Sequence, residues 1–166
     1  MAGLMERLVG VLTDQLSNYD ALIGLSEIKK DVIVSNDAES LQKITSEENA
    51  VVGRVQKLDK SRVSIMADIA DVMDIREADY TLTDLCELIK EQDEYETLCG
   101  IVKSTREKLE ELKAINTKNK ELVENSLDYI DFSMNVMRSS IVPEKRFYNT
   151  SGDEIAPGSG FFDARQ

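Results

Sequence analysis

The first 142 residues contain no proline, and this feature most limits how the chain can fold. Proline interrupts helices because its ring removes a backbone donor and clashes with the preceding turn. Only five glycines fall in the same stretch, so residues that favour turns are scarce as well. The sequence therefore predicts a helical domain over residues 1–139 and a flexible tail over 140–166, where both prolines lie.

Hydrophobic residues recur at steps of three and four along most of the helical part, as one face of a helix requires. The stretches with this spacing are 4–32, 41–75, 83–89 and 93–138. We expect Asn36 or Asp37 to cap the second helix, and Thr83 to cap the third, by accepting hydrogen bonds from free N–H groups. Because the connections are short, the pattern predicts an all-α fold, an elongated antiparallel α-helical hairpin bundle or coiled coil.

Polar residues interrupt these apolar seams at a few positions. Glu48 and Arg62 lie on the seam of the second helix, and Asn116 and Asn119 lie on the seam of the last. A buried asparagine in a coiled coil lowers stability but fixes the register of the helices. We therefore interpret the two asparagines as a polar layer that sets the register of the bundle. The alternative is a hydrogen-bonding position in a groove that binds a partner.

Several classes of chemistry have no residues to support them. The chain has no histidine, which removes Ser–His and Cys–His pairs, histidine zinc sites and Glu-x-x-His di-iron sites. Acidic pairs are expected by chance in a chain that is 31% charged. Cys86 and Cys99 lack the spacing of a metal or redox motif and are most simply reduced, buried thiols. We expect no catalytic, cofactor or metal site, and therefore no enzyme.

Charge and hydropathy restrict the partners. A net charge of −12 argues against binding to nucleic acid or to anionic lipid, because both need basic groups. No stretch approaches the roughly 18–20 apolar residues of a membrane span. Residues 1–16 lack the basic start and cleavage site of a signal peptide. These observations predict a cytoplasmic protein without membrane insertion.

The end of the last helix is apolar, and this helix is longer than the two long helices that precede it. An overhanging apolar end needs a partner, and its methionines suit an adaptable contact. The tail also carries four of the nine aromatic residues, although disordered segments are usually poor in them. The alternatives for the tail are a recognition segment that orders on binding and a disordered end with incidental aromatics.

One block of the sequence, NTKNKELVENSLDYIDFS at residues 116–133, resembles the C-terminal part of the FlgN family of flagellar export chaperones. The shared pattern is an asparagine, a turn led by leucine, Ser-Leu, an aromatic residue and a final small polar residue. Residues 148–152 and 161–163 are similar to the tail of members of this family. The opening through Leu8, Leu12 and Leu16 and the acidic second helix also fit the family's all-α hairpin.

The resemblance implies a cytoplasmic chaperone that binds the hook–filament junction proteins FlgK and FlgL before type III export. It also implies delivery of the client to components of the flagellar export gate. The family's C-terminal region carries client binding, and by position this implies contacts at Leu127, Ile130, Met134, Met137, Ile141, Phe147 and Tyr148. A client helix laid on this apolar face would complete the bundle.

Two other functions stay open. The chain could be a structural or scaffolding coiled coil that pairs with itself, for example as a homodimer. It could also be a regulator that binds another cytosolic protein through the same surfaces. In each case the net charge of −12 would keep an incomplete bundle soluble.

Overall fold

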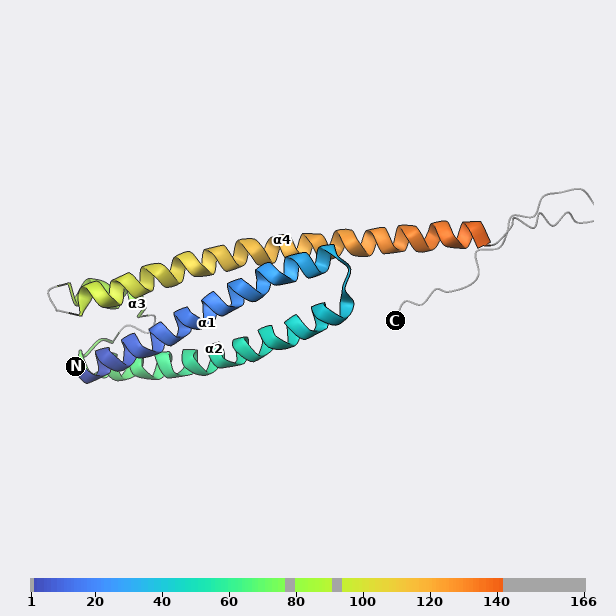
Figure 1. Ribbon diagram of the computed structural model, residues 1–166. Helices are drawn as coiled ribbons and strands as arrows, with labels where there is room; N and C mark the ends of the chain where they lie inside the picture. Colours follow the sequence, from blue (N-terminus) through green and yellow to red (C-terminus); the bar gives the residue numbers. More distant parts are fainter. Residues whose placement is uncertain (1, 77–79, 91–93, 142–166) are drawn as a thin grey trace, which may run out of the picture. The chain divides into compact units, whose positions relative to one another are not determined.

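The computed structural model describes residues 2–76, 80–90 and 94–141, and every regular element in these ranges is an α-helix (Figure 1). The helices are α1 (Ala2–Val34), α2 (Ala38–Val72), α3 (Leu82–Leu88) and α4 (Tyr95–Ile141). The all-α fold predicted from the spacing of hydrophobic residues is confirmed. Among the described helices, none combines the length and the apolar character that crossing a bilayer requires.

The chain divides into two compact units, residues 1–126 and residues 127–166. The first unit contains α1, α2, α3 and α4 as far as residue 126. Of the second unit, the structure describes the α4 residues 127–141. Residues 142–166 lie outside the described residues, so the expected division into a helical domain at 1–139 and a flexible tail stays a prediction.

In the first unit, α1 and α2 form an antiparallel hairpin. Lys29 Nζ of α1 lies 2.8 Å from Glu48 Oε2 of α2. Farther from the turn, Arg54 Nε donates a hydrogen bond of 3.1 Å to Asn18 Oδ1. Residue numbers fall along α1 as they rise along α2, which shows that the helices run in opposite directions. Each spans about 50 Å, since a helix rises 1.5 Å per residue.

The turn between α1 and α2 explains where the second helix begins. Asn36 has a φ of 55°, the left-handed conformation that often ends a helix. Asp37 is the N-cap, because its Oδ1 accepts a hydrogen bond of 3.0 Å from Ser40 N. Hydrogen bonds from the side chain and backbone of Ser40 also hold the pKa of Asp37 below its usual value. Of the two expected caps, Asp37 is therefore the one that forms.

The cap of α3 differs from the expected one. Thr81, not Thr83, caps this helix, and it forms a reciprocal capping box with Asp84. Asp84 N donates to Thr81 Oγ1 at 3.2 Å, and Thr81 N donates to Asp84 Oδ2 at 2.8 Å. The prediction for Thr83 was wrong because Thr81 has an acidic residue three positions later that completes the box. The hydrogen bonds from Thr81 lower the pKa of Asp84.

The first part of α4 runs parallel to α1. Lys108 Nζ lies 2.9 Å from Asp20 Oδ1, and Asn119 Nδ2 donates a hydrogen bond of 2.7 Å to the backbone oxygen of Ser26. Residue numbers rise together along the two helices. The three long helices of the first unit therefore follow an up, down, up order, with α1 in contact with both of the others (Figure 1).

The main core lies where the start of α1, the end of α2, α3 and the start of α4 meet. Its buried members are Met5, Leu8, Leu12, Ile65, Met66, Ile69, Leu85, Cys86, Ile89 and Leu98. Seven of the ten are leucine or isoleucine, and burying such a side chain contributes about 1.5–3 kcal/mol. This core fixes the positions of the four helices at one end of the first unit. Farther along α1 and α2, buried side chains such as Ile33, Ile44 and Val51 continue the apolar contact between the two helices.

Candidate partner-binding surfaces

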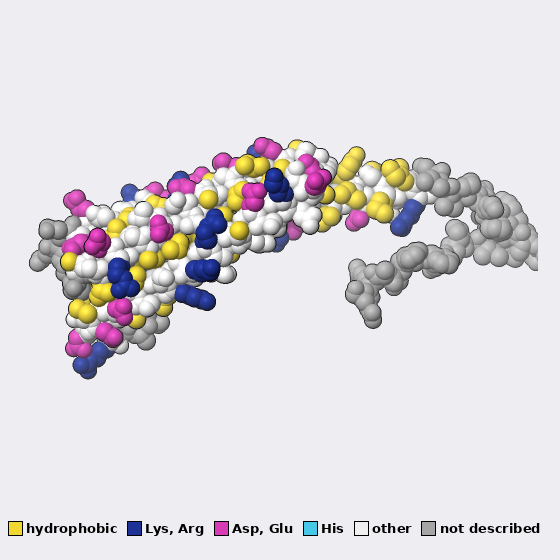
Figure 2. Space-filling view, turned by 60° about the horizontal axis from the view of Figure 1, so that its bottom comes forward, with side chains coloured by type: hydrophobic (Ala, Val, Ile, Leu, Met, Phe, Trp, Pro, Cys, Tyr) yellow, Lys and Arg dark blue, Asp and Glu magenta, His cyan; other side chains and the backbone are white. Residues whose placement is uncertain are grey.

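The described part of α4 beyond residue 126 exposes large hydrophobic side chains, and we call this surface the α4 apolar end. Its members are Leu127, Tyr129, Ile130, Phe132, Met134, Val136 and Met137, whose exposed fractions run from 44% for Ile130 to 67% for Tyr129. Figure 2 shows hydrophobic side chains covering much of this segment. Because exposed apolar groups that adjoin one another are typical of interaction sites, this surface is a candidate for covering by a partner.

The α4 apolar end consists of two stripes. The residues predicted as client contacts, Leu127, Ile130, Met134 and Met137, follow one another at steps of three and four and form the first stripe. Tyr129, Phe132 and Val136 have the same spacing but lie on roughly the opposite side of the helix, since each residue turns it by about 100°. A helix that is apolar on two sides is normally enclosed by neighbours.

The contacts predicted from the sequence include only the first stripe. The second stripe, which begins at Tyr129, has the same steps of three and four, so its periodicity could have revealed it. The structure does not describe the side chains of the other predicted client contacts, Ile141, Phe147 and Tyr148. Ile141 is the last residue of α4, and Phe147 and Tyr148 lie outside the described residues.

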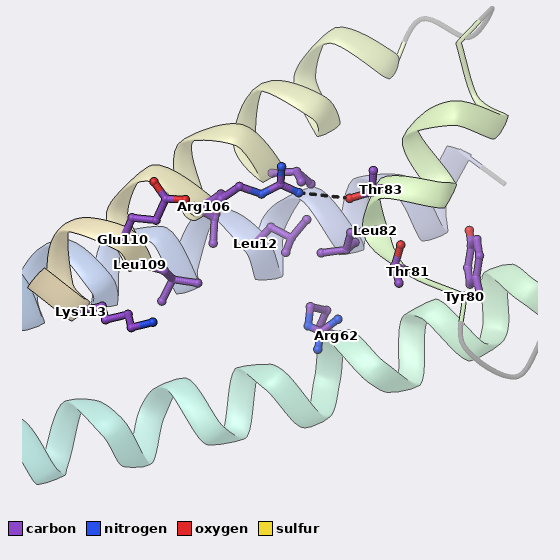
Figure 3. A pocket seen from close by; sticks show the side chains of 12 residues that line it. Leu12, Arg62, Tyr80, Thr81, Leu82, Thr83, Arg106, Leu109, Glu110 and Lys113 are labelled. Carbon is purple, nitrogen blue, oxygen red and sulfur yellow. Dashed lines mark hydrogen bonds between the residues drawn. The ribbon is translucent and has the colours of Figure 1, made fainter.

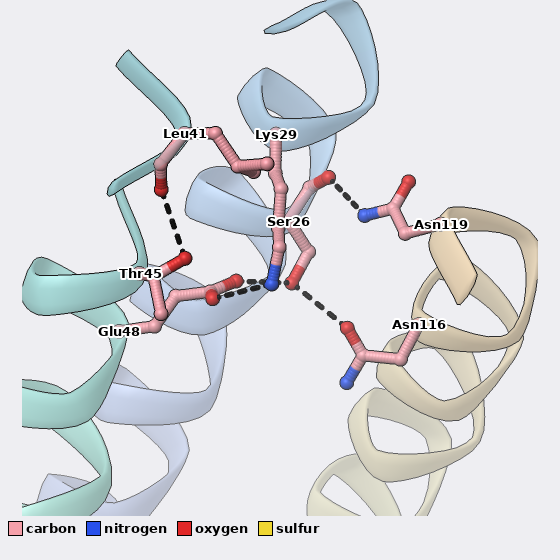
Figure 4. Close-up of polar contacts among 7 residues, drawn as sticks. All are labelled: Ser26, Lys29, Leu41, Thr45, Glu48, Asn116 and Asn119. Carbon is pink, nitrogen blue, oxygen red and sulfur yellow. Dashed lines mark hydrogen bonds and ion pairs between the residues drawn. The ribbon is translucent and has the colours of Figure 1, made fainter. Parts of the chain in front are cut away.

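The two predicted asparagines meet α1 at Ser26, as Figure 4 shows. Asn119 is 4% exposed and donates to the backbone oxygen of Ser26. The hydroxyl of Ser26 lies 3.2 Å from Asn116 Oδ1, and Asn116 itself is exposed. The structure therefore brings both asparagines to one polar cluster, with Asn119 inside the contact and Asn116 at its edge.

An ion pair between α1 and α2 completes this cluster. Glu48 Oε2 accepts a hydrogen bond of 2.8 Å from Lys29 Nζ, and the two side chains are 14% and 24% exposed. Glu48 Oε1 lies 3.4 Å from Ser26 Oγ (Figure 4). A hydroxyl has one proton, so Ser26 donates to either Glu48 or Asn116 at a given moment. The seam position of Glu48 was predicted, whereas Ser26 and Lys29 were not.

A hollow next to α3 combines an apolar base with basic walls, and we call it the basic groove. It has a volume of about 520 Å³, and its lining includes Leu12 of α1, Arg62 of α2, Leu82 of α3, and Arg106, Leu109 and Lys113 of α4. Figure 3 shows Arg62 on the opposite side of the hollow from Arg106. Arg106 donates a hydrogen bond of 3.4 Å to Thr83 Oγ1, whereas Arg62 is paired with Asp59 at 2.8 Å.

A second hollow, which we call the polar groove, includes the Ser26 cluster in its lining. It has a volume of about 580 Å³. Ser26 and Lys29 line it from α1, Glu48 from α2, and Asn116 and Asn119 from α4. The two asparagines therefore belong both to a polar layer between helices and to the lining of a groove, the two alternatives considered from the sequence. Whether they contribute to binding a partner stays a prediction.

The cysteines lie at the core end of the first unit. Cys86 and Cys99 are both free thiols, and Cys86 is buried. Burial, followed by a hydrogen bond with Cys99, raises the pKa of Cys86 to about 12. Among the described residues, no group of acidic residues and cysteines is arranged to hold a metal ion.

Iodoacetamide at pH 8 is expected to alkylate Cys86 in the folded protein at least a hundredfold more slowly than in the unfolded chain. A pKa of about 12 leaves roughly a thousandth of the thiolate that the unperturbed thiol would supply. Mass spectrometry of tryptic peptides measures the rate at each cysteine, and the chain in 6 M guanidinium is the reference. Similar rates in the folded and unfolded states would show that the thiol is open to solvent.

Comparison with protein families gives a match. The family model described as FlgN protein matches residues 1–154, which include all four helices. No curated protein and no solved structure matches the chain.

Proposed function

Because the chain belongs to the FlgN family of flagellar export chaperones, we propose that it binds the hook–filament junction proteins FlgK and FlgL in the cytosol before type III export. The proposed contact is the first stripe of the α4 apolar end with the amphipathic C-terminal helix of the client. The observation that supports this is the exposure of the stripe, in which Met137 is 62% and Leu127 is 56% exposed.

The chemistry of the stripe suits such a client. An amphipathic helix binds by placing its apolar face against an apolar surface, with anchors at steps of three and four. Leucine and isoleucine give the surface its hydrophobic area, and the two methionines adapt to clients of different shape. Ordering the client on binding costs free energy, so we expect a modest affinity that permits release at the export gate.

The remaining predicted contacts belong to the same proposal. Ile141, Phe147 and Tyr148 would extend the apolar surface along the chain beyond Met137. Support for them comes from the family resemblance and from the concentration of aromatic residues in the last twenty positions. Binding and delivery of a client require no bond to be made or broken, so we propose a binding protein and not an enzyme.

Serine substitutions in the first stripe test this proposal. The triple variant Ile130→Ser, Met134→Ser, Met137→Ser is expected to bind a synthetic FlgK C-terminal peptide at least tenfold more weakly. Three apolar anchors would then be lost from a surface that carries few other contacts. Isothermal titration calorimetry measures the affinity, and circular dichroism checks that the helix content is kept.

A matched control exists in the first unit. Ile28, Val63 and Val72 are 55%, 54% and 59% exposed, so the triple serine variant removes similar apolar surface elsewhere. It should bind the peptide as the unchanged chain does. Undiminished binding by the α4 variant, or equal loss in both variants, would argue against the proposed contact.

A self-associating coiled coil is the second candidate, and the two stripes of the α4 apolar end favour it. A second copy of the chain could cover one stripe, as in a homodimer. Sedimentation velocity distinguishes the two functions. A scaffold forms oligomers that the α4 serine variant dissociates and that the client peptide leaves unchanged, whereas a chaperone forms a complex with the peptide.

A further inference from the structure

The basic groove has a charge opposite to that of the protein. The chain carries 32 acidic and 20 basic side chains, with a net charge of −12. In contrast, three basic side chains, Arg62, Arg106 and Lys113, line this groove with a single acidic one, Glu110. A local positive field in an acidic protein favours a partner that brings carboxylates.

Two of these basic groups are available for a partner. None of the ion pairs in the described part of the chain includes Arg106 or Lys113, whereas Arg62 is held by Asp59. Arg106 makes a long hydrogen bond of 3.4 Å to Thr83, which leaves most of its donors unused. In Figure 3, the side chain of Lys113 extends into the space between α4 and α2.

The groove also offers apolar surface to a partner. Leu109 is 42% exposed at its wall, and Leu12 and Leu82 line it from α1 and α3.

The shape of the site favours a helix over a small molecule. The basic groove and the polar groove are both lined by α1, α2 and α4. Together their linings cover residues 102–124 of α4, a stretch of about 33 Å at 1.5 Å per residue. Figure 2 shows hydrophobic side chains gathered in a band along this unit, between charged ones. Three helices with such a groove lack the fourth member of a four-helix bundle.

We propose that the basic groove binds an acidic amphipathic helix of a partner protein, with Arg106 and Lys113 receiving two carboxylates that are seven residues apart. Arg106 and Lys113 are themselves seven residues apart, which is close to two helical turns or about 10 Å, so a helix lying along α4 matches this spacing. Leucines on the face between the carboxylates and the groove cover Leu82 and Leu109, which keep exposed apolar surface there. This second binding site goes beyond the proposed function, which concerns the α4 apolar end.

Charge exchange tests the site with a designed probe. The probe is an 18-residue capped peptide with leucines at helical steps of three and four and two glutamates seven residues apart. A matched peptide carries lysines in place of the glutamates. The full-length Arg106→Glu, Lys113→Glu variant is expected to bind the glutamate peptide at least tenfold more weakly than the unchanged chain, and to bind the lysine peptide more tightly. Fluorescence anisotropy measures both affinities.

The control variant Lys103→Glu, Lys118→Glu makes the same change in net charge on the same helix. Both lysines are exposed and lie outside the lining of the two grooves. Equal weakening by this variant, unchanged binding by the groove variant, or no binding of the glutamate peptide to the unchanged chain would overturn the proposal. The serine variant of the α4 apolar end should still bind the glutamate peptide, so failure of one site is distinguishable from failure of the other.

Discussion

Leu98→Ala is expected to lower the free energy of unfolding by about 3 kcal/mol, because it leaves a cavity in the main core. Leu98 has no exposed surface and is the one described residue of α4 among the buried core residues. Its side chain packs where the start of α4 meets α1, α2 and α3. Urea unfolding followed by circular dichroism at 222 nm measures the change, and an unchanged m value would support comparison of the two free energies.

Leu109→Ala is the matched control on the same helix. Its side chain is 42% exposed, so the same truncation should cost about 1 kcal/mol or less. If both variants lose equal stability, the start of α4 is not held by the core as described. A loss in Leu98→Ala alone shows that α4 depends on this contact at its first turns.

Lys29→Met is expected to cost about 2 kcal/mol, because it leaves the half-buried carboxylate of Glu48 without its cation. Glu48 has a side chain that is only 14% exposed, and Lys29 Nζ is its nearest charge at 2.8 Å. The double variant Lys29→Met, Glu48→Leu should regain most of this stability, since it replaces both charges by apolar groups. In that variant, the hydroxyl of Ser26 keeps Asn116 as its acceptor.

The exposed ion pair Lys120–Glu124 provides the control for the variants of Lys29 and Glu48. Its atoms are 4.0 Å apart and its side chains are 78% and 61% exposed. Lys120→Met should change the free energy of unfolding by no more than about 0.5 kcal/mol, since surface ion pairs contribute little. Thermal unfolding of these three variants and of the unchanged chain in one buffer measures the set. A double variant as unstable as Lys29→Met would show that the unpaired carboxylate of Glu48 is not the source of the loss.

Periodicity predicted the fold well because it reports which residues face a neighbour. The seam residues Ile44, Val51, Ile65 and Ile69 of α2 are buried, as their spacing required. The exact helix ends were predicted less well, since they depend on side-chain hydrogen bonds. Thr81 caps α3 through its partner Asp84, a local contact that hydrophobic spacing does not report.

The candidate sites were predicted only in part for a related reason. Spacing placed Asn116 and Asn119 on one seam, but it could not show that Asn119 is buried while Asn116 is exposed. Nor could it show that Arg106 and Lys113 face the same hollow as Arg62, because that depends on how α4 packs beside α2. The spacing of residues shows which of them share one face of a helix, whereas a groove forms only where several helices pack together.

The up, down, up order of the three long helices has a kinetic consequence. Both grooves are already walled by α2 and α4 and floored by α1, so a fourth helix can enter from solution without separating any existing pair. Association is then limited by docking and by ordering of the partner, with rate constants of about 10⁵–10⁷ M⁻¹s⁻¹, and not by opening of the bundle. Differences between partners would therefore appear mainly as differences in how long each complex lasts.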